Sequence, residues 1–348
     1  MHEPAVSNTV DASALDLQFL TRERQRELNA MRPGDRVSIL RRHRLLPLAA
    51  QAELTPADSD DALSQVLHSL QQAQISHLVL KGAAHANHLY ARASFRPRTD
   101  SDLWVPVASV EGASAVLLRL GYRETSVPDD PLAQQKSFAP PVALGKPIDL
   151  HIALSNLPEF SLQFSFDRLH SRSIALPRIS PMARGLCAVD SILHSTMHYF
   201  GHTPAAERPA IWLLDLALTA THLSDEQWSE LDRESRACGV ASLLAAAIDL
   251  SQTWFHCPCP DNLHAAWRGH ADDEWRSARL AEQSSVGAEL RLAVRAFPDW
   301  TSRCRYLWRR AFPGAEFMRN CGALTPGSHL PLAYLKRLFR AARRGRAP

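Results

Sequence analysis

The sequence predicts an α+β protein, in which a small mixed β-sheet with flanking helices is followed by a helical C-terminal domain. The apolar run at 78–80 and the period-2 alternation at 148–153 predict strands in the first half. Beyond about residue 180 the strand signals fade and helical patterns follow one another. We therefore expect N-terminal helices packing on the core at 1–58, the sheet core at 59–180, and a helical bundle with a basic C-terminal tail at 181–348.

The first half alternates helices and strands around a turn at Gly82. An alanine-rich stretch after this turn predicts a helix at 83–90, and Gly121 predicts the end of another helix at 109–120. Prolines between 127 and 146 predict a long irregular connection or a lid. The other helices are expected at 14–31, 37–54, 60–75, 184–200, 210–222, 225–238, 241–255, 272–297, 302–312 and 331–344.

The turn at Lys81 and Gly82 ends an apolar strand and places a helix N-terminus beside it. Free backbone N–H groups and the positive end of the helix dipole favour a phosphate there, and a glycine lets a ligand approach the backbone closely. We expect the backbone of Gly82 and Ala83 to cradle phosphates, while Lys81 or Arg96 offsets their charge.

Two aspartates one residue apart, Asp100 and Asp102, open the next strand. Side chains at i and i+2 of a strand share a face, so both carboxylates can converge on a metal ion while Ser101 faces away. Asp149 joins them if its strand pairs beside theirs. Mg²⁺ prefers a few carboxylates together with phosphate oxygens, and two ions can steady both oxygens of a displacement. Because three unpaired carboxylates repel one another, we expect Asp102→Asn to stabilise the metal-free fold.

Taken in order, these motifs resemble the uncharacterised nucleotidyltransferase family of the polymerase-beta-like superfamily. The residues that carry the resemblance are Leu80-Lys81-Gly82, Arg96, Asp100, Asp102, Gly121-Tyr122 and Asp149-Leu150-His151. Similarity continues through HSTMHYF, WLLDLAL, LWRRAFPGAEFMRN and YLKRLFR, so it covers almost the whole chain. Three positions depart from the family pattern. Ile152 replaces a Trp after His151, which bears on packing more than on chemistry. Ser101 replaces an aliphatic residue, which predicts a less buried strand, and Ala83 replaces a Ser or Gly that would contact phosphate.

The resemblance implies a metal-dependent nucleotidyltransferase, which moves a nucleoside monophosphate from a nucleoside triphosphate (NTP) to an acceptor hydroxyl and releases pyrophosphate. Asp100 and Asp102 would hold the Mg²⁺ ion that grips the triphosphate, and Asp149 would help to hold a second ion. A small molecule, a peptide, a protein side chain or an RNA end is compatible as the acceptor. Two alternatives stay open: a nucleotide-binding protein without turnover, and a protein-interaction module with a vestigial sheet.

Composition limits the partners and the compartment. A formal net charge of +3 over 348 residues does not favour nucleic acid as a partner. The apolar stretches are too short for a membrane helix, and no basic segment leads into an apolar run at the N-terminus. We therefore expect a cytoplasmic protein whose cysteines are reduced.

Four further features allow both a functional and a structural interpretation. His194 and His198 share a helix face, either as ligand or phosphate contacts or as packed histidines. Asp215 lies among apolar residues and is expected to need an arginine partner. The basic cluster at 41–44 is expected to be a solvated helix face rather than a phosphate site. The tail at 336–346 is expected to be a solvated, frayed helix rather than a binder of RNA, lipid or an acidic partner.

Overall fold

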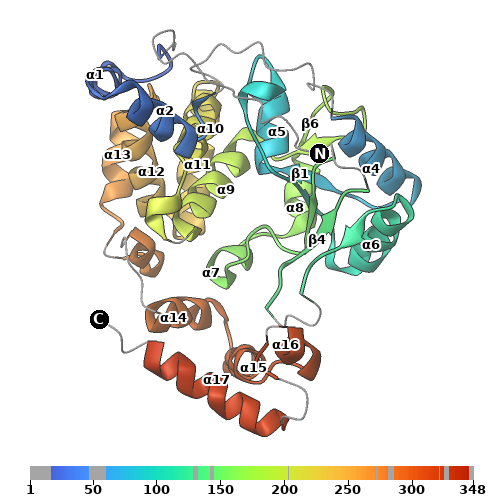
Figure 1. The fold of residues 1–348 in the computed structure, drawn as a ribbon. Coiled ribbons are helices and arrows are strands. Elements are labelled where there is room, and N and C mark those ends of the chain that lie inside the picture. Colours follow the sequence, from blue (N-terminus) through green and yellow to red (C-terminus); the bar gives the residue numbers. More distant parts are fainter. Residues whose placement is uncertain are drawn as a thin grey trace.

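A computed structural model describes residues 17–46, 60–127, 132–141, 145–202, 204–271, 273–280, 286–320, 322–324 and 329–344. The end of the helix expected at 37–54 lies outside these residues. Figure 1 shows three groups of elements: a sheet with its helices, a helical bundle beside it, and a C-terminal group of helices. Every helix within the described ranges is too short or too polar to span a lipid bilayer.

The sheet is mixed, and its strand order is β3-β4-β5-β2-β1-β7-β6. At its centre, β2 pairs antiparallel with β1 and parallel with β5. This sheet and the helices that follow it confirm the α+β class. The strands are β1 (Leu78–Leu80), β2 (Ser101–Trp104), β3 (Arg123–Glu124), β4 (Gln135–Ala139), β5 (Ile148–His151), β6 (Ile174–Ala175) and β7 (Arg184–Gly185).

The register of the sheet places the two acidic strands side by side. Asp102 of β2 lies opposite Asp149 of β5. Every residue of β1 and β2 is buried, so the expectation of a less buried β2 is wrong. Ser101 is accommodated in this buried strand because Arg98 donates a hydrogen bond to its hydroxyl.

Helices α4 (Asp61–Gln72) and α6 (Val110–Arg119) pack together with the sheet in one hydrophobic core (Figure 1). The buried residues of α4 follow the i, i+3, i+4, i+7 spacing typical of an amphipathic helix: Leu63, Val66, Leu67 and Leu70. Gly121 follows α6 with a φ of +85°, which confirms the predicted glycine end of this helix. Between β1 and β2, α5 (Lys81–His88) begins directly after β1.

The segment predicted to be an irregular connection contains a strand, because β4 pairs antiparallel with β5. Only Phe138 of β4 is buried, so the sequence lacks the alternating apolar pattern that would identify the strand. The sequence did not predict β6 and β7 either. Each of them spans only two residues, which is too short for a period to be visible.

The N-terminal helices pack on the helical bundle, not on the sheet core where the sequence placed them. Leu28 and Leu40 belong to the same hydrophobic core as the apolar residues of the bundle. The backbone N–H of Thr21 also donates to the carbonyl of Trp254 at 3.0 Å. The helices concerned are α1 (Arg22–Ala30), α2 (Pro33–Arg42), α9 (Ala188–Gly201), α10 (Ile211–Ala220), α11 (Asp225–Ala237), α12 (Ala241–Trp254) and α13 (Asp261–Arg268).

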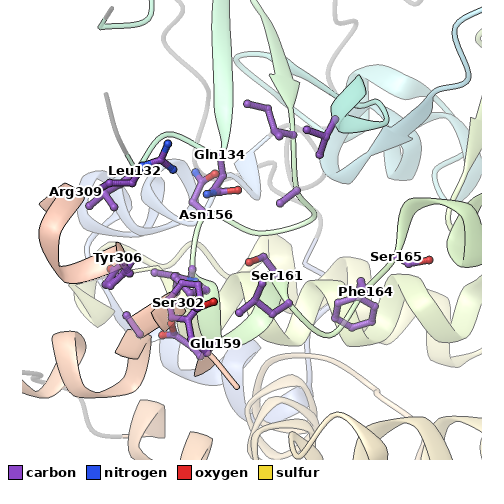
Figure 2. A pocket seen from close by; sticks show the side chains of 18 of the residues that line it. Leu132, Gln134, Asn156, Glu159, Ser161, Phe164, Ser165, Ser302, Tyr306 and Arg309 are labelled. Atoms are coloured by element: carbon purple, nitrogen blue, oxygen red, sulfur yellow. The ribbon is translucent and has the colours of Figure 1, made fainter. Parts of the chain in front are cut away.

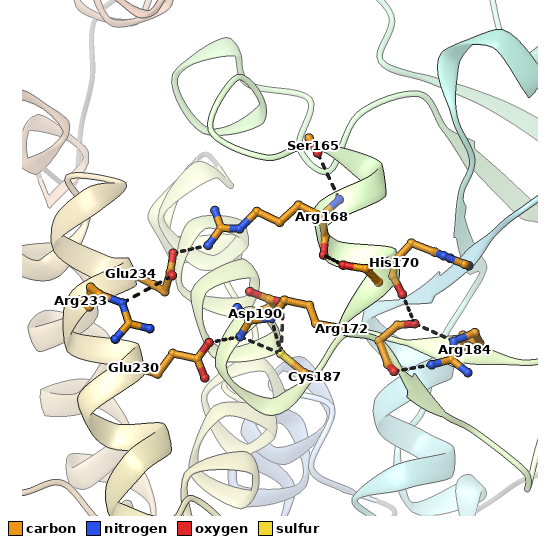
Figure 3. A network of polar contacts seen from close by, with 12 residues as sticks. Ser165, Arg168, His170, Arg172, Arg184, Cys187, Asp190, Glu230, Arg233 and Glu234 are labelled. Carbon is orange, nitrogen blue, oxygen red and sulfur yellow. Dashed lines mark hydrogen bonds and ion pairs between the residues drawn. The ribbon is translucent and has the colours of Figure 1, made fainter.

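Ion pairs tie the segment after α8 (Phe166–Ser171) to the bundle (Figure 3). Arg172 Nε lies 2.9 Å from Asp190 Oδ2 on α9, and its Nη2 lies 2.5 Å from Glu230 Oε1 on α11. Arg172 also donates to the Sγ of Cys187, a free thiol, at 3.3 Å. Because Asp190 is only 2% exposed, Arg172 is the cation that compensates its buried charge.

The C-terminal helices form a group of their own beside α7 (Pro158–Ser161), coloured brown to red in Figure 1. They are α14 (Val286–Ala296), α15 (Trp300–Ala311), α16 (Ala315–Asn320) and α17 (Leu330–Arg344). The basic tail expected at 336–346 begins on α17, and its side chains from 338 onward lie outside the described residues.

Candidate active site

A cavity of about 350 Å³ lies between the acidic strands and the bundle helix α9. Asp100, Asp102 and Asp149 line it from the sheet side, and His194 and His198 line it from α9. The three aspartates meet because β2 and β5 are adjacent parallel strands in register, so Asp102 and Asp149 share a face.

Asp102 is held by a lysine and a histidine. Lys81 Nζ donates to Asp102 Oδ1 at 2.7 Å, and His151 Nε2 lies 2.7 Å from the same oxygen. Burial alone would raise the pKa of Asp102, but Lys81 and His151 outweigh burial and hold this pKa well below the usual range of a carboxyl. Asp102 is therefore ionised, and the Lys81 ammonium balances its charge.

Lys81 reaches Asp102 from a left-handed backbone conformation with a φ of +47°. A residue with a Cβ is held in such a conformation at a cost of about 1–3 kcal/mol, and such strain clusters at functional sites. The role of Gly82 is steric. A Cβ at Gly82 would lie 3.2 Å from the Cβ of Arg98. Glycine therefore lets the loop before β2, which carries Arg96 and Arg98, pack closely against α5.

Asp149 is oriented by two donors from β4. Ser137 Oγ donates to Asp149 Oδ1 at 2.6 Å, and Gln135 Nε2 donates to Asp149 Oδ2 at 3.1 Å. Asp100 is in a different electrostatic situation: burial raises its pKa, and the neighbouring charges of Asp102 and Asp149 raise it further. Asp100 is thus the carboxyl that most needs an additional positive charge.

Arg96 does not offer a free cation to a phosphate, because it pairs with Asp215. Its Nη2 lies 2.6 Å from Asp215 Oδ2, and the two side chains are 3% and 2% exposed. Tyr90 Oη donates to the same carboxylate at 2.8 Å, and His85 Nδ1 lies 3.1 Å from it. Burial would raise the pKa of Asp215, but Arg96 and His85 outweigh burial and lower it well below the usual range. The arginine partner expected for Asp215 is therefore Arg96.

Ala83, the other predicted phosphate contact, and the nearby Arg98 both have structural roles. Ala83 is buried in the sheet core, and the cavity is lined instead by its neighbour Gly82. Arg98 pairs with Asp60, and it donates to the carbonyl of Asp100 at 2.9 Å. Arg98 thus fixes the backbone of Asp100 through the carbonyl group.

The wall opposite the sheet contains an arginine that the sequence did not select. Arg44 lines the cavity, and it has a φ of +59°. Burial and the nearby Arg96 lower the pKa of Arg44, while the charge of Asp100 raises it. The expectation of a solvated face holds for Arg41 and Arg42, which are exposed, but it is wrong for Arg44. No local pattern could have singled out Arg44, because only the packing of the N-terminal helices on the bundle brings it to the cavity.

Both histidines of α9 line the cavity; His194 is buried, and His198 is partly exposed. Burial, with the nearby Lys81, lowers their pKa values well below the usual range, so both are neutral at pH 7. The His198 ring also packs on Trp212, with the ring centroids 4.3 Å apart. The structure therefore shows packed histidines that face the cavity, and their role as ligand contacts stays a prediction.

The three aspartates are the residues that could hold a cation. Their oxygen donors suit Mg²⁺, and the raised pKa of Asp100 reflects an excess of negative charge that a cation would relieve. Within the described ranges, no three His, Cys, Asp or Glu side chains surround a common metal position. Lys81 and His151 both contact Asp102 Oδ1, so a cation at that oxygen would compete with the Lys81 ammonium.

The mixed sheet gathers aspartates from adjacent strands beside Lys81 and Gly82 at the start of α5, which is the arrangement expected of a protein of the nucleotidyltransferase class. The particular family follows from the sequence comparison. The chain belongs to the family described as uncharacterised nucleotidyltransferase, whose family model matches residues 49–256, more than half of the chain.

Among solved structures, the chain is similar to the antibiotic-resistance factor ANT(2'')-Ia, a solution structure described as showing substrate-regulated conformation dynamics. The similarity has a TM-score of 0.35 and 16% sequence identity, and it covers 51% of this chain and 93% of that one. No curated protein matches the chain.

Proposed function

We propose that the protein transfers a nucleoside monophosphate from an NTP to an acceptor hydroxyl and that the reaction depends on Mg²⁺. The observation that carries this proposal is the cavity shared by Asp100, Asp102, Asp149 and Lys81. A bond forms between the acceptor oxygen and the α-phosphorus, and the bond to the leaving pyrophosphate oxygen breaks. The hydroxyl proton passes to solvent. Positioning and charge neutralisation supply most of the catalysis in such transfers.

Asp100 and Asp102 would hold the Mg²⁺ ion that grips the triphosphate, and Asp149 would help to hold a second. When bound, Mg²⁺ would neutralise charge on the triphosphate and lower the pKa of the acceptor hydroxyl. The hydrogen bonds from Ser137 and Gln135 support this role for Asp149, because they present its carboxylate in a fixed direction.

Lys81 and Arg44 are the cations that we assign to the triphosphate. Lys81 donates to Asp102, so the same ammonium becomes available to a phosphate once another cation neutralises Asp102. Gly82 lines the cavity at the N-terminus of α5, where its backbone can face a phosphate. Arg96 would act by positioning the loop before β2 through its ion pair with Asp215.

A second candidate function is nucleotide binding without turnover. The observation that favours it is the ion pair between Lys81 and Asp102, which supplies a positive charge at the aspartate without a metal. The two candidates differ in whether pyrophosphate is released.

The test uses water as the acceptor. Each of ATP, GTP, CTP and UTP is incubated with the protein and Mg²⁺, and pyrophosphate is measured. We expect slow release from at least one triphosphate, reduced by about 100-fold in Asp149→Asn. The matched control is Asp167→Asn, an exposed aspartate on α8, which should leave the rate unchanged. Triphosphate binding without release would favour the second candidate, and neither binding nor release would favour the protein-interaction module.

A further inference from the structure

We propose that a second, larger cavity binds the acceptor, and that the acceptor is a hydroxyl-bearing small molecule with an apolar body and an acidic group. This inference rests on the proposed function. The cavity has a volume of about 720 Å³ and lies between residues 156–166 and helices α14 and α15 (Figure 2). Pockets for small molecules typically measure about 300–1,000 Å³.

The two cavities adjoin, because Asn156 lines both of them. Asn156 Nδ2 donates to Gln135 Oε1 at 3.0 Å, and Gln135 Nε2 donates to Asp149 Oδ2 at 3.1 Å. This chain of hydrogen bonds runs from the larger cavity to the aspartate that we assign to activation of the acceptor hydroxyl. The larger cavity therefore lies next to the residues that orient Asp149, and we infer that a molecule seated in it presents its hydroxyl toward the aspartates.

The walls of the larger cavity suit an apolar body. Trp104 and Phe166 line it and meet edge to face, with ring centroids 5.2 Å apart. Leu162 also lines it and remains 50% exposed. Figure 2 shows Tyr306 of α15 and Phe164 on opposite sides of the space. Exposed apolar and aromatic groups in one concave site are typical of ligand pockets.

The charge of the cavity selects an anion. Four arginines and two glutamates line it, which leaves an excess of two positive charges. Arg279 is 3% exposed and pairs with the buried Glu159, so these two side chains satisfy each other. The excess comes from Arg305, Arg309 and Arg310 of α15. Guanidinium groups form charge-assisted hydrogen bonds to carboxylate or phosphate, and they disfavour a cationic acceptor.

The test compares three naphthalene probes that share one hydroxyl and differ in the second substituent: hydroxynaphthoate, hydroxynaphthyl phosphate and aminomethyl naphthol. Their affinities are measured by titration calorimetry on the full chain. We expect both acidic probes to bind at least about tenfold more tightly than the amine, because charge-assisted bonds contribute about this much. The tighter of the two acidic probes identifies carboxylate or phosphate as the preferred group.

A double variant, Arg305→Gln with Arg309→Gln, should weaken the acidic probes by about tenfold or more and should not weaken the amine, because it removes two charges that repel a cation. The control is Arg291→Gln, an exposed arginine of α14 outside the cavity lining, which should change none of the affinities. Equal affinities of the three probes, or an unchanged double variant, would overturn the proposal.

Triphosphate binding distinguishes a failure of the acceptor proposal from a failure of the proposed function. If the wild type binds a triphosphate with Mg²⁺ but shows no preference for the acidic probes, only the acceptor proposal is wrong. If no triphosphate binds, the proposed function is wrong and the acceptor role is lost with it.

Discussion

The buried ion pair between Arg96 and Asp215 gives a sharp prediction, because it lies beside the candidate site and is almost fully enclosed. We consider Asp215→Leu, Arg96→Met and the double variant. Arg96 Nε donates to both carboxylate oxygens, at 2.9 and 3.0 Å, and Nη2 donates to one of them at 2.6 Å. Tyr90 adds a further hydrogen bond to Asp215. Either single change leaves the charge of the other partner buried without its counter-ion.

The expected cost of each single change in the free energy of unfolding is about 3–5 kcal/mol, since removal of one partner leaves an unpaired charge inside the protein. The double variant should cost at least about 2 kcal/mol less than the sum of the singles, because it leaves neither charge behind. The exposed pair of Lys136 and Glu111, in which Glu111 is 84% exposed, serves as the comparison. Glu111→Gln should cost less than about 1 kcal/mol.

Urea unfolding followed by tryptophan fluorescence and far-UV circular dichroism measures these differences, provided that both probes give the same midpoint. The reasoning would be refuted if the costs of the two single variants in the free energy of unfolding added up to the cost of the double variant. An Asp215→Leu change that costs no more than Glu111→Gln would refute it too.

Three further predictions follow from the site. Asp100→Asn should raise the melting temperature of the metal-free protein, because it removes repulsion from Asp102 and Asp149. Asp102→Asn should lower the melting temperature, because it leaves Lys81 without its ion-pair partner. The reverse order of the two melting temperatures would contradict this charge balance. Gly82→Ala should cost about 1–3 kcal/mol in urea unfolding, because its Cβ crowds Arg98, and an unchanged midpoint would contradict the close packing. The pKa of His194 is lowered in the folded state, so the unfolded chain binds a proton there first, and stability falls as the pH drops below about 6.5. His194→Gln should flatten this decline between about pH 6.5 and 5 by up to about 1.4 kcal/mol per pH unit, and an identical slope would rule out His194 as its source.

Two strands of the site, β1 and β5, could be predicted from the sequence because each has a clear local pattern. The apolar run of β1 and the alternation around Asp149 in β5 identify both strands directly. The sequence predicts that Asp102 and Asp149 converge if their strands pair, and β2 and β5 do pair in register. The need of Asp215 for an arginine was also visible in its apolar surroundings.

The rest of the site depends on tertiary contacts that no local pattern encodes. β4 supplies Ser137 and Gln135 to Asp149, but only one residue of that strand is buried, so its apolar periodicity is absent. Arg44 reaches the cavity through the packing of the N-terminal helices on the bundle. The identity of the arginine that pairs with Asp215 could not be predicted, because Arg96 lies 119 residues away in the chain.

The structure also corrects the expected response of the site to mutation. The sequence alone indicates three unpaired carboxylates and predicts that Asp102→Asn stabilises the metal-free fold. In the structure, Asp102 contacts both Lys81 and His151, while Asp100 carries the uncompensated charge. We therefore expect Asp100→Asn, and not Asp102→Asn, to stabilise the metal-free fold.

The central claim is that the aspartate cavity binds a triphosphate together with Mg²⁺. Titration calorimetry of ATP, GTP, CTP and UTP, with and without Mg²⁺, on the wild type and on Asp100→Asn tests it most directly. The account predicts that at least one triphosphate binds in a Mg²⁺-dependent manner and that this dependence is lost in Asp100→Asn, although the variant is folded. Binding that is equally strong without Mg²⁺, or that is unchanged in Asp100→Asn, would contradict it.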